Sequence, residues 1–196
     1  MFRRTLMLLV VAALVLATVG AASAAVIRVR VEGKSNTIFG ATQPRASATT
    51  ALGALESASM AGEFYYHVQP TSFGPYIDQI GRYAAGGSGG WVFKVNGQSP
   101  PVGADQVTVK NGDVVLWYWA EFGDSGGPPT LDLARVGNGC YRVAARSDAG
   151  STVAVSATLR VDGRRVPMAG GRACPGPHRG LVRATAPGAV RSNALK

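Results

Sequence analysis

Residue types that commonly carry chemistry are scarce in this chain of 196 residues. It has two cysteines, Cys140 and Cys174, and two histidines, His67 and His178. A structural zinc site needs about four such ligands at short spacing, and these are scattered along the sequence. The sequence also has no phosphate-binding glycine loop, nucleophile elbow or paired-carboxylate motif. We therefore predict a protein that is not an enzyme and needs no metal or cofactor.

One segment, Gly123-Asp124-Ser125-Gly126-Gly127-Pro128, is similar to the nucleophile segment of chymotrypsin-like serine proteases. His67 and several aspartates precede Ser125, so the order His, Asp, Ser is present. The surroundings of His67 are nevertheless unlike those in such proteases, and the chain is too short for their two β-barrels. Glycine, serine and proline are typical of linkers, so residues 124–130 are predicted to be a linker.

Residues 1–24 are typical of an export signal. Arg3 and Arg4 precede an uncharged, mostly apolar run, and Ala22-Ser23-Ala24 resembles a cleavage site. The apolar run is shorter than the ~20 residues of a membrane span, although an uncleaved anchor remains an alternative. We predict an extracellular or cell-surface protein without a further membrane span. Because exported cysteines are commonly oxidised, Cys140 and Cys174 are predicted to form a disulfide.

Aromatic residues are concentrated between residues 89 and 123, which contain all three tryptophans. Residues 91–95 alternate in polarity like a half-buried strand, whereas residues 114–120 are apolar on both faces and should be covered on both sides. Most aromatic side chains are expected to pack in the core. The alternative is a ligand groove beside the glycine run at residues 86–90. The candidate ligand-binding residues are Trp91, Trp117, Tyr118, Trp119, Tyr65 and Tyr66.

Two motifs in this stretch resemble a known family. They are Gly-Gly-Trp-x-x-x-Val-Asn-Gly at residues 89–97 and Lys-Asn-Gly-Asp-Val-Val-x-Trp at residues 110–117, separated by a loop with Val102-Gly103-Ala104. Together they resemble the β-grasp domain that closes the cobalamin carriers transcobalamin and intrinsic factor. The resemblance extends over residues 26–123 and implies cobalamin as a possible ligand. The large helical domain that buries most of the vitamin in those carriers is lacking here.

The order of elements before residue 89 agrees with a β-grasp domain. Residues 26–31 alternate as a half-buried strand, with Arg28 and Arg30 on the polar face, and residues 37–40 begin a return strand. A helix should follow, capped by Thr49 or Thr50 and ended by Gly62. Residues 63–69, 76–83 and 106–110 are further candidate strands.

Charge separates the two halves of the chain. Residues 26–130 contain seven Lys/Arg and eight Asp/Glu, whereas residues 131–196 contain eleven and three, a net charge of +8. Short strands separated by turn signals in the second half suggest a small β-sandwich, weakly similar to Ig-like or prealbumin-like modules. Its arginines are expected on a solvated outer face, or else on a surface for anionic polymers.

The predicted class is α+β: a β-grasp domain with one helix, followed by a small all-β, sandwich-like domain. The domains are residues 25–123 and 131–196, after the signal and on either side of the linker. We predict a secreted binding module for a small molecule, such as a corrinoid, or for a glycan. The alternative is a structural or adhesive surface protein held to anionic envelope polymers. Nucleic acid is not expected, because no binding motif accompanies the charge.

Overall fold

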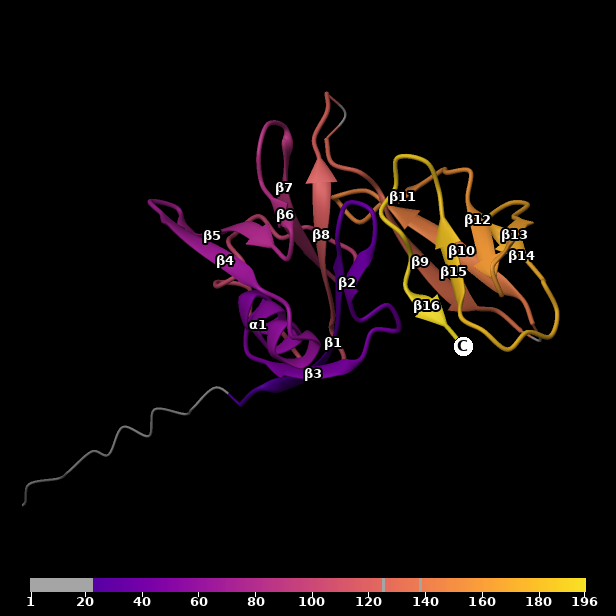
Figure 1. Cartoon of the computed structure of the whole chain (residues 1–196), viewed down its shortest axis with the longest axis horizontal. Coiled ribbons are helices and arrows are strands. Elements are labelled where there is room, and N and C mark those ends of the chain that lie inside the picture. The colour runs from indigo at the N-terminus through magenta and orange to yellow at the C-terminus, as the bar shows by residue number, and fades with distance from the viewer. Residues whose placement is uncertain (1–22, 125, 138) are drawn as a thin grey trace, which may run out of the picture.

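The computed structural model describes residues 23–124, 126–137 and 139–196, so the predicted export segment lies almost wholly outside the described residues. These residues form sixteen strands in four sheets and one helix (Figure 1). The N-terminal half, up to residue 124, and the C-terminal half, from residue 126, lie side by side in Figure 1.

A five-stranded sheet organises the N-terminal half. Its order is β2-β1-β8-β7, β3 also pairs with β1, and the central β1–β8 pair is parallel. The alternation of Ile27, Val29 and Val31 explains the inner face, because all three side chains are fully buried. The strands are β1 (Ala25–Glu32), β2 (Thr37–Phe39), β3 (Arg45–Ala48), β7 (Gly89–Val95) and β8 (Val114–Glu121).

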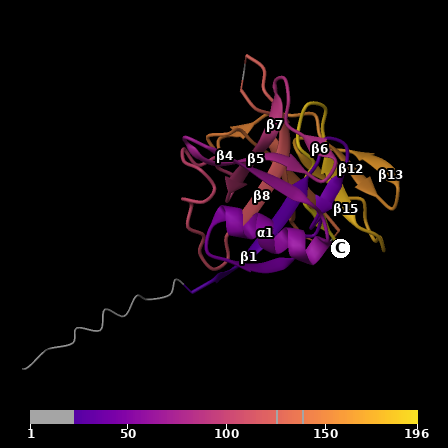
Figure 2. The same ribbon diagram turned by 60° about the vertical axis from the view of Figure 1, so that its left-hand side comes forward.

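The helix α1 (Ala51–Gly62) lies across this sheet (Figure 2). The Thr50 hydroxyl accepts a hydrogen bond from the Gly53 amide at 3.0 Å, which confirms the predicted cap. Leu55 and Ala58 pack on the sheet in the main hydrophobic core. The predicted stop was displaced by one residue: Gly62 is the last helical residue, and Glu63 has the left-handed conformation.

A separate three-stranded sheet, β4-β5-β6, projects from the N-terminal half (Figure 1). It consists of β4 (Tyr66–Thr71), β5 (Gly74–Ile80) and β6 (Tyr83–Ala84). Only part of this sheet touches the core, because Ile77 and Ile80 are buried whereas most of β4 is exposed. The expected strand at residues 106–110 is absent from the described structure apart from a single bridge between Thr108 and Thr50.

The C-terminal half consists of two four-stranded sheets around their own hydrophobic core. Leu131, Tyr141 and Leu159 are completely buried there. The predicted disulfide between Cys140 and Cys174 is confirmed. One sheet has β9 (Thr130–Arg135), β10 (Tyr141–Arg146), β11 (Thr152–Val153) and β14 (Arg172–Ala173); the other has β12 (Thr158–Val161), β13 (Arg164–Pro167), β15 (Val182–Thr185) and β16 (Ala194–Leu195).

The prediction of an α+β chain with a β-grasp domain was wrong. One helix of 12 residues stands against sixteen strands, so the described chain is mostly β. The prediction gave the helix too much weight, and it assigned no strand to Arg45–Ala48, which pairs with β1. It also did not expect the strands after the helix to form a sheet of their own.

Strand β8 is covered on both faces, as its composition predicted. Trp117 contributes to the core beneath α1, whereas Leu116, Tyr118 and Ala120 pack with Val190 of the C-terminal half. The same contact between halves explains a wrong prediction for β1. Arg30 was expected on a solvated face, but its side chain is completely buried at the junction of the two halves.

Candidate functional site

Trp117, a predicted ligand-binding residue, is a core residue. Its side chain is 2% exposed, its indole Nε1 donates to the Ala51 carbonyl at 3.0 Å, and its ring stacks on Phe93 with centroids 5.1 Å apart. The hydrogen bond attaches the start of α1 to β8. Trp117 is therefore placed to stabilise the fold and not to contact a ligand.

Trp91 and Trp119 form an aromatic cluster with Tyr83. The two indoles meet edge to face with centroids 5.8 Å apart, and the Trp91 Nε1 donates to the Tyr83 carbonyl at 2.8 Å. Gly89 allows this packing, because a Cβ at that position would lie 2.6 Å from Cζ2 of Trp119. Within the glycine run, Gly89 therefore brings the chain close to an indole. Trp119 is the partly exposed member of the pair.

Of the three tyrosines predicted for the site, Tyr118 borders a pocket with the indole of Trp91, whereas Tyr65 and Tyr66 line neither that pocket nor the one beside Trp119. Tyr118 projects from the opposite face of β8, and its hydroxyl bonds with Asp148 at 3.2 Å. Burial, reinforced by the Asp148 carboxylate, raises the pKa of Tyr118 well above its ordinary value. Tyr65 is 59% exposed and Tyr66 packs partly against the core. A smaller pocket of about 250 Å³ is bordered by Trp91, Tyr118 and Asp148.

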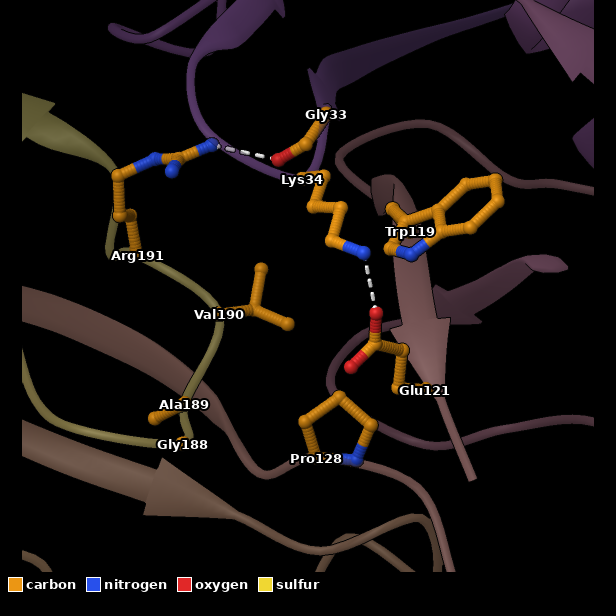
Figure 3. Close-up of a pocket in the computed structure, with 9 residues that line it drawn as sticks. All are labelled: Gly33, Lys34, Trp119, Glu121, Pro128, Gly188, Ala189, Val190 and Arg191. Atoms are coloured by element: carbon orange, nitrogen blue, oxygen red, sulfur yellow. Dashed lines mark hydrogen bonds and ion pairs between the residues drawn. The ribbon is translucent and has the colours of Figure 1, made fainter. Parts of the chain in front are cut away.

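Another pocket, of about 450 Å³, lies at the junction of the two halves (Figure 3). We call it the junction pocket. Trp119 and Glu121 of β8 and Lys34 after β1 form its N-terminal wall, and the opposite wall comes from the C-terminal half (Figure 3). The pocket is lined by Gly33, Lys34, Trp119, Glu121, Pro128, Gly188, Ala189, Val190 and Arg191.

Three polar side chains of the junction pocket could bind a ligand. Lys34 pairs with Glu121, and both are more than half exposed. The Trp119 Nε1 is buried and has no hydrogen-bond partner among the described residues, and Figure 3 shows it on the side of the ring that faces Lys34. An indole, an ammonium and a carboxylate provide one apolar surface, donors and an acceptor, as in sites that bind polar small molecules.

Arg191 connects the junction pocket to a buried charge cluster. Its Nη2 donates to the Gly33 carbonyl at 2.7 Å, and its Nε donates to Glu32 at 3.1 Å. Arg183 also pairs with Glu32, and Arg30 lies 3.4 Å from the same carboxylate. Three guanidinium groups thus share one buried carboxylate. Burial is the main cause that lowers the pKa of Arg30 to about 10, against the opposing effect of Glu32.

A second buried cation joins the halves on the other side of β8. The Lys94 ammonium donates to the carbonyls of Ser147 and Arg146 at 2.8 and 3.1 Å, and lies 3.4 Å from Asp148. Burial lowers its pKa, against the opposing effect of Asp148. Charged side chains therefore connect the two halves on both sides of β8.

The sequence analysis missed Lys34, Glu121 and Arg191. Each is a charged residue near a turn or strand end, where such residues are usually solvated. Glu32 and Arg191 lie 159 positions apart, so no local pattern could have joined them. Among the residues that line the junction pocket, the sequence analysis had named only Trp119 as a candidate ligand-binding residue, because it lies beside glycine-rich segments.

The described residues contain no group of three or more His, Cys, Asp or Glu side chains arranged to hold a metal ion. His67 bonds to Asp78 at 2.7 Å, and Ser125 lies outside the described residues. Within the part of the chain that the structure describes, no helix is long and apolar enough to cross a membrane.

A family model described as "Domain of unknown function (DUF4430)" matches residues 48–121. This match lies inside the segment for which the sequence predicted a family resemblance. No curated protein matches the chain.

Two solved structures are similar to about half of the chain. Haptocorrin in complex with Cbi is 21% identical, with a TM-score of 0.45 over 52% of this chain. The chain covers 26% of haptocorrin, about a quarter of that relative's length. A protein from Ruminococcus gnavus ATCC 29149, described as a "putative metal binding protein", is 19% identical, with a TM-score of 0.37 over 50% of this chain and 97% of its own. Both similarities are partial.

Proposed function

We propose that the protein is a secreted, non-enzymatic binding module whose ligand, a neutral or weakly charged sugar, occupies the junction pocket. The observation that supports this proposal most is the partly exposed indole of Trp119 beside Lys34 and Glu121. Sugars present an apolar ring face and a rim of hydroxyl groups, which suit an indole surface and charged hydrogen-bonding groups respectively. The disulfide is consistent with an extracellular location.

The size of the junction pocket favours a sugar over a corrinoid. Its volume of about 450 Å³ is in the lower part of the range for ligand sites. A corrin macrocycle with its side chains is several times larger than a sugar ring, so most of it would project into solvent. Corrinoid binding, suggested by the sequence resemblance, is thus the second ligand class to test.

Titration of the purified protein with mono- and disaccharides tests this proposal through tryptophan fluorescence, with cobalamin as the competing ligand. Trp119→Phe should weaken sugar binding about three- to tenfold, because phenylalanine offers the sugar a smaller ring face than the indole. Glu121→Gln should also weaken binding, whereas Tyr65→Phe, an exposed change away from the pocket, should not. Saturation by cobalamin but by no sugar, or equal affinity in the parent and Trp119→Phe, would contradict the proposal.

A further inference from the structure

A row of arginines crosses the outer face of the sheet formed by β13, β12 and β15. The strand register places Arg160 opposite Arg165 on one side and opposite Arg183 on the other. Directly opposite residues project from the same face of a sheet. Leu159 and Val161, on either side of Arg160, point into the core. The exposed Arg160 and Arg165 side chains therefore lie next to each other on the outer face, at the strand spacing of about 5 Å, whereas the Arg183 guanidinium turns to Glu32 and Thr37 at the junction.

The charge of this arginine row is not balanced within the described chain. Arg183 pairs with Glu32, but Glu32 is shared with two further arginines. Arg160 and Arg165 are exposed and form none of the ion pairs found among the described residues. The nearest acid in sequence, Asp162, instead accepts a hydrogen bond from the Gly180 amide at 2.7 Å. Like charges on opposite residues destabilise a sheet, so an anion on this row would relieve a repulsion.

We propose that the arginine row binds an acidic polysaccharide with one carboxylate on each sugar. A sugar ring is about as long as the ~5 Å between strands, so successive carboxylates can meet successive arginines. Guanidinium groups bind carboxylates through paired hydrogen bonds. A single exposed ion pair contributes little free energy, whereas a polymer gains from several pairs at once. This surface lies outside the junction pocket and does not depend on the sugar proposed there.

The other residues of this face argue against nucleic acid. Thr158, Pro167 and Thr185 share the outer face with the arginines, as the register shows. No aromatic side chain is among the residues that this register places on the face. Single-stranded nucleic acids are usually held by stacking on such side chains. A smooth polar face with regularly spaced cations is better suited to a carbohydrate chain.

The test is binding of the full chain to immobilised polygalacturonate, measured at low and high salt. Arg160→Gln combined with Arg165→Gln should weaken binding about tenfold. The matched control is Arg142→Gln combined with Arg172→Gln, which removes an equally exposed, directly opposite arginine pair from the other sheet and should change affinity less than about threefold. All four side chains are exposed, so thermal unfolding of both variants should remain near that of the parent.

Three outcomes would overturn the proposal: no binding of the parent, equal losses in both double variants, or tighter binding of linear polyphosphate than of polygalacturonate. Equal losses of affinity would mean that binding depends on the net charge of the protein and not on the position of these arginines. Preference for polyphosphate would mean that the ligand is a phosphate polymer. Because sugar binding in the junction pocket is measured by Trp119 fluorescence, failure of either proposal can be recognised separately.

Discussion

Tyr118 shows how one residue acquires unusual properties from both halves of the chain. It belongs to β8, but its hydroxyl bonds to Asp148 and its ring lies 5.7 Å from the Lys94 ammonium. A phenol buried next to a carboxylate ionises with difficulty, because ionisation would bring a second negative charge into a poorly solvated place. The raised pKa of Tyr118 therefore depends on contact between the halves.

This dependence predicts an effect of pH on stability. With the pKa raised in the folded state, the stability that neutral Tyr118 contributes is complete below about pH 10 and is lost as pH rises through the folded pKa. Tyr118→Phe, which loses a hydrogen bond, should be about 1 kcal/mol less stable than the parent at neutral pH. That deficit should shrink above about pH 10 in urea unfolding experiments. A deficit that is constant from pH 7 to pH 11 would contradict this account.

At the level of elements, β7 contacts the junction pocket through Gly89, which packs against Trp119. Gly89→Ala would place a Cβ 2.6 Å from the indole, so we expect a loss of about 1 to 3 kcal/mol and displacement of Trp119. Gly86→Ala, in the same glycine run, meets no atom within 4 Å and should be neutral or slightly stabilising. Denaturant unfolding and Trp119 fluorescence distinguish the two. Similar losses of stability in both variants would mean that residues 86–90 need glycine for backbone flexibility and not for close packing against Trp119.

The disulfide is the second element-scale feature with a measurable effect. It joins residues 34 positions apart across the end of β10 and the segment after β14. Replacing both cysteines by serine should lower the free energy of unfolding by about 4 kcal/mol, because the unfolded chain regains the entropy of an open loop. Comparison of this variant with the oxidised parent in urea measures the effect. A loss below about 1 kcal/mol would show that the sheets hold this half together without the bridge.

Sequence patterns predicted single elements better than their assembly. Ile27, Val29 and Val31 identified β1 because alternation reflects a local property of strands, and Thr50 identified the helix cap for a similar reason. The polar segment Arg45–Ala48 gave no such signal, since its pairing with β1 depends on a partner about twenty residues away. The site was harder still to predict. Trp119 was recognised by type, but Arg191 reaches the pocket only because the halves meet.

At the scale of the whole molecule, the Glu32 carboxylate links the two halves directly. Its carboxylate binds Arg183 and Arg191 of the C-terminal half and Thr37 of its own half. Glu32→Gln would leave three buried or half-buried arginines without a counter-charge at the junction. A broken buried ion pair commonly costs about 3 to 5 kcal/mol.

The destabilisation caused by Glu32→Gln should make unfolding of the two halves less cooperative. In the parent, unfolding followed by tryptophan fluorescence, which reports the N-terminal half, should coincide with unfolding followed by circular dichroism, which reports both halves. In Glu32→Gln the two curves should separate. Glu121→Gln is the control, because it removes the same charge from an exposed pair and should change stability by less than about 1 kcal/mol. Coincident curves in both variants would show that the halves do not depend on Glu32.

Residues 188–195 run between the two halves. The Val190 amide donates to the Pro129 carbonyl at 2.9 Å, the Ala194 amide to the Ala41 carbonyl at 2.7 Å, and the Val190 side chain covers the outer face of β8. The exposed turn at Pro187 and Gly188 leads into this segment. Proteolytic cleavage at this turn would detach Val190 from Leu116 and Ala120. The apolar surface that is then exposed on β8 should favour self-association. The same cleavage would remove one wall of the junction pocket. Cleaved protein should therefore lose binding of the proposed sugar ligand and should aggregate.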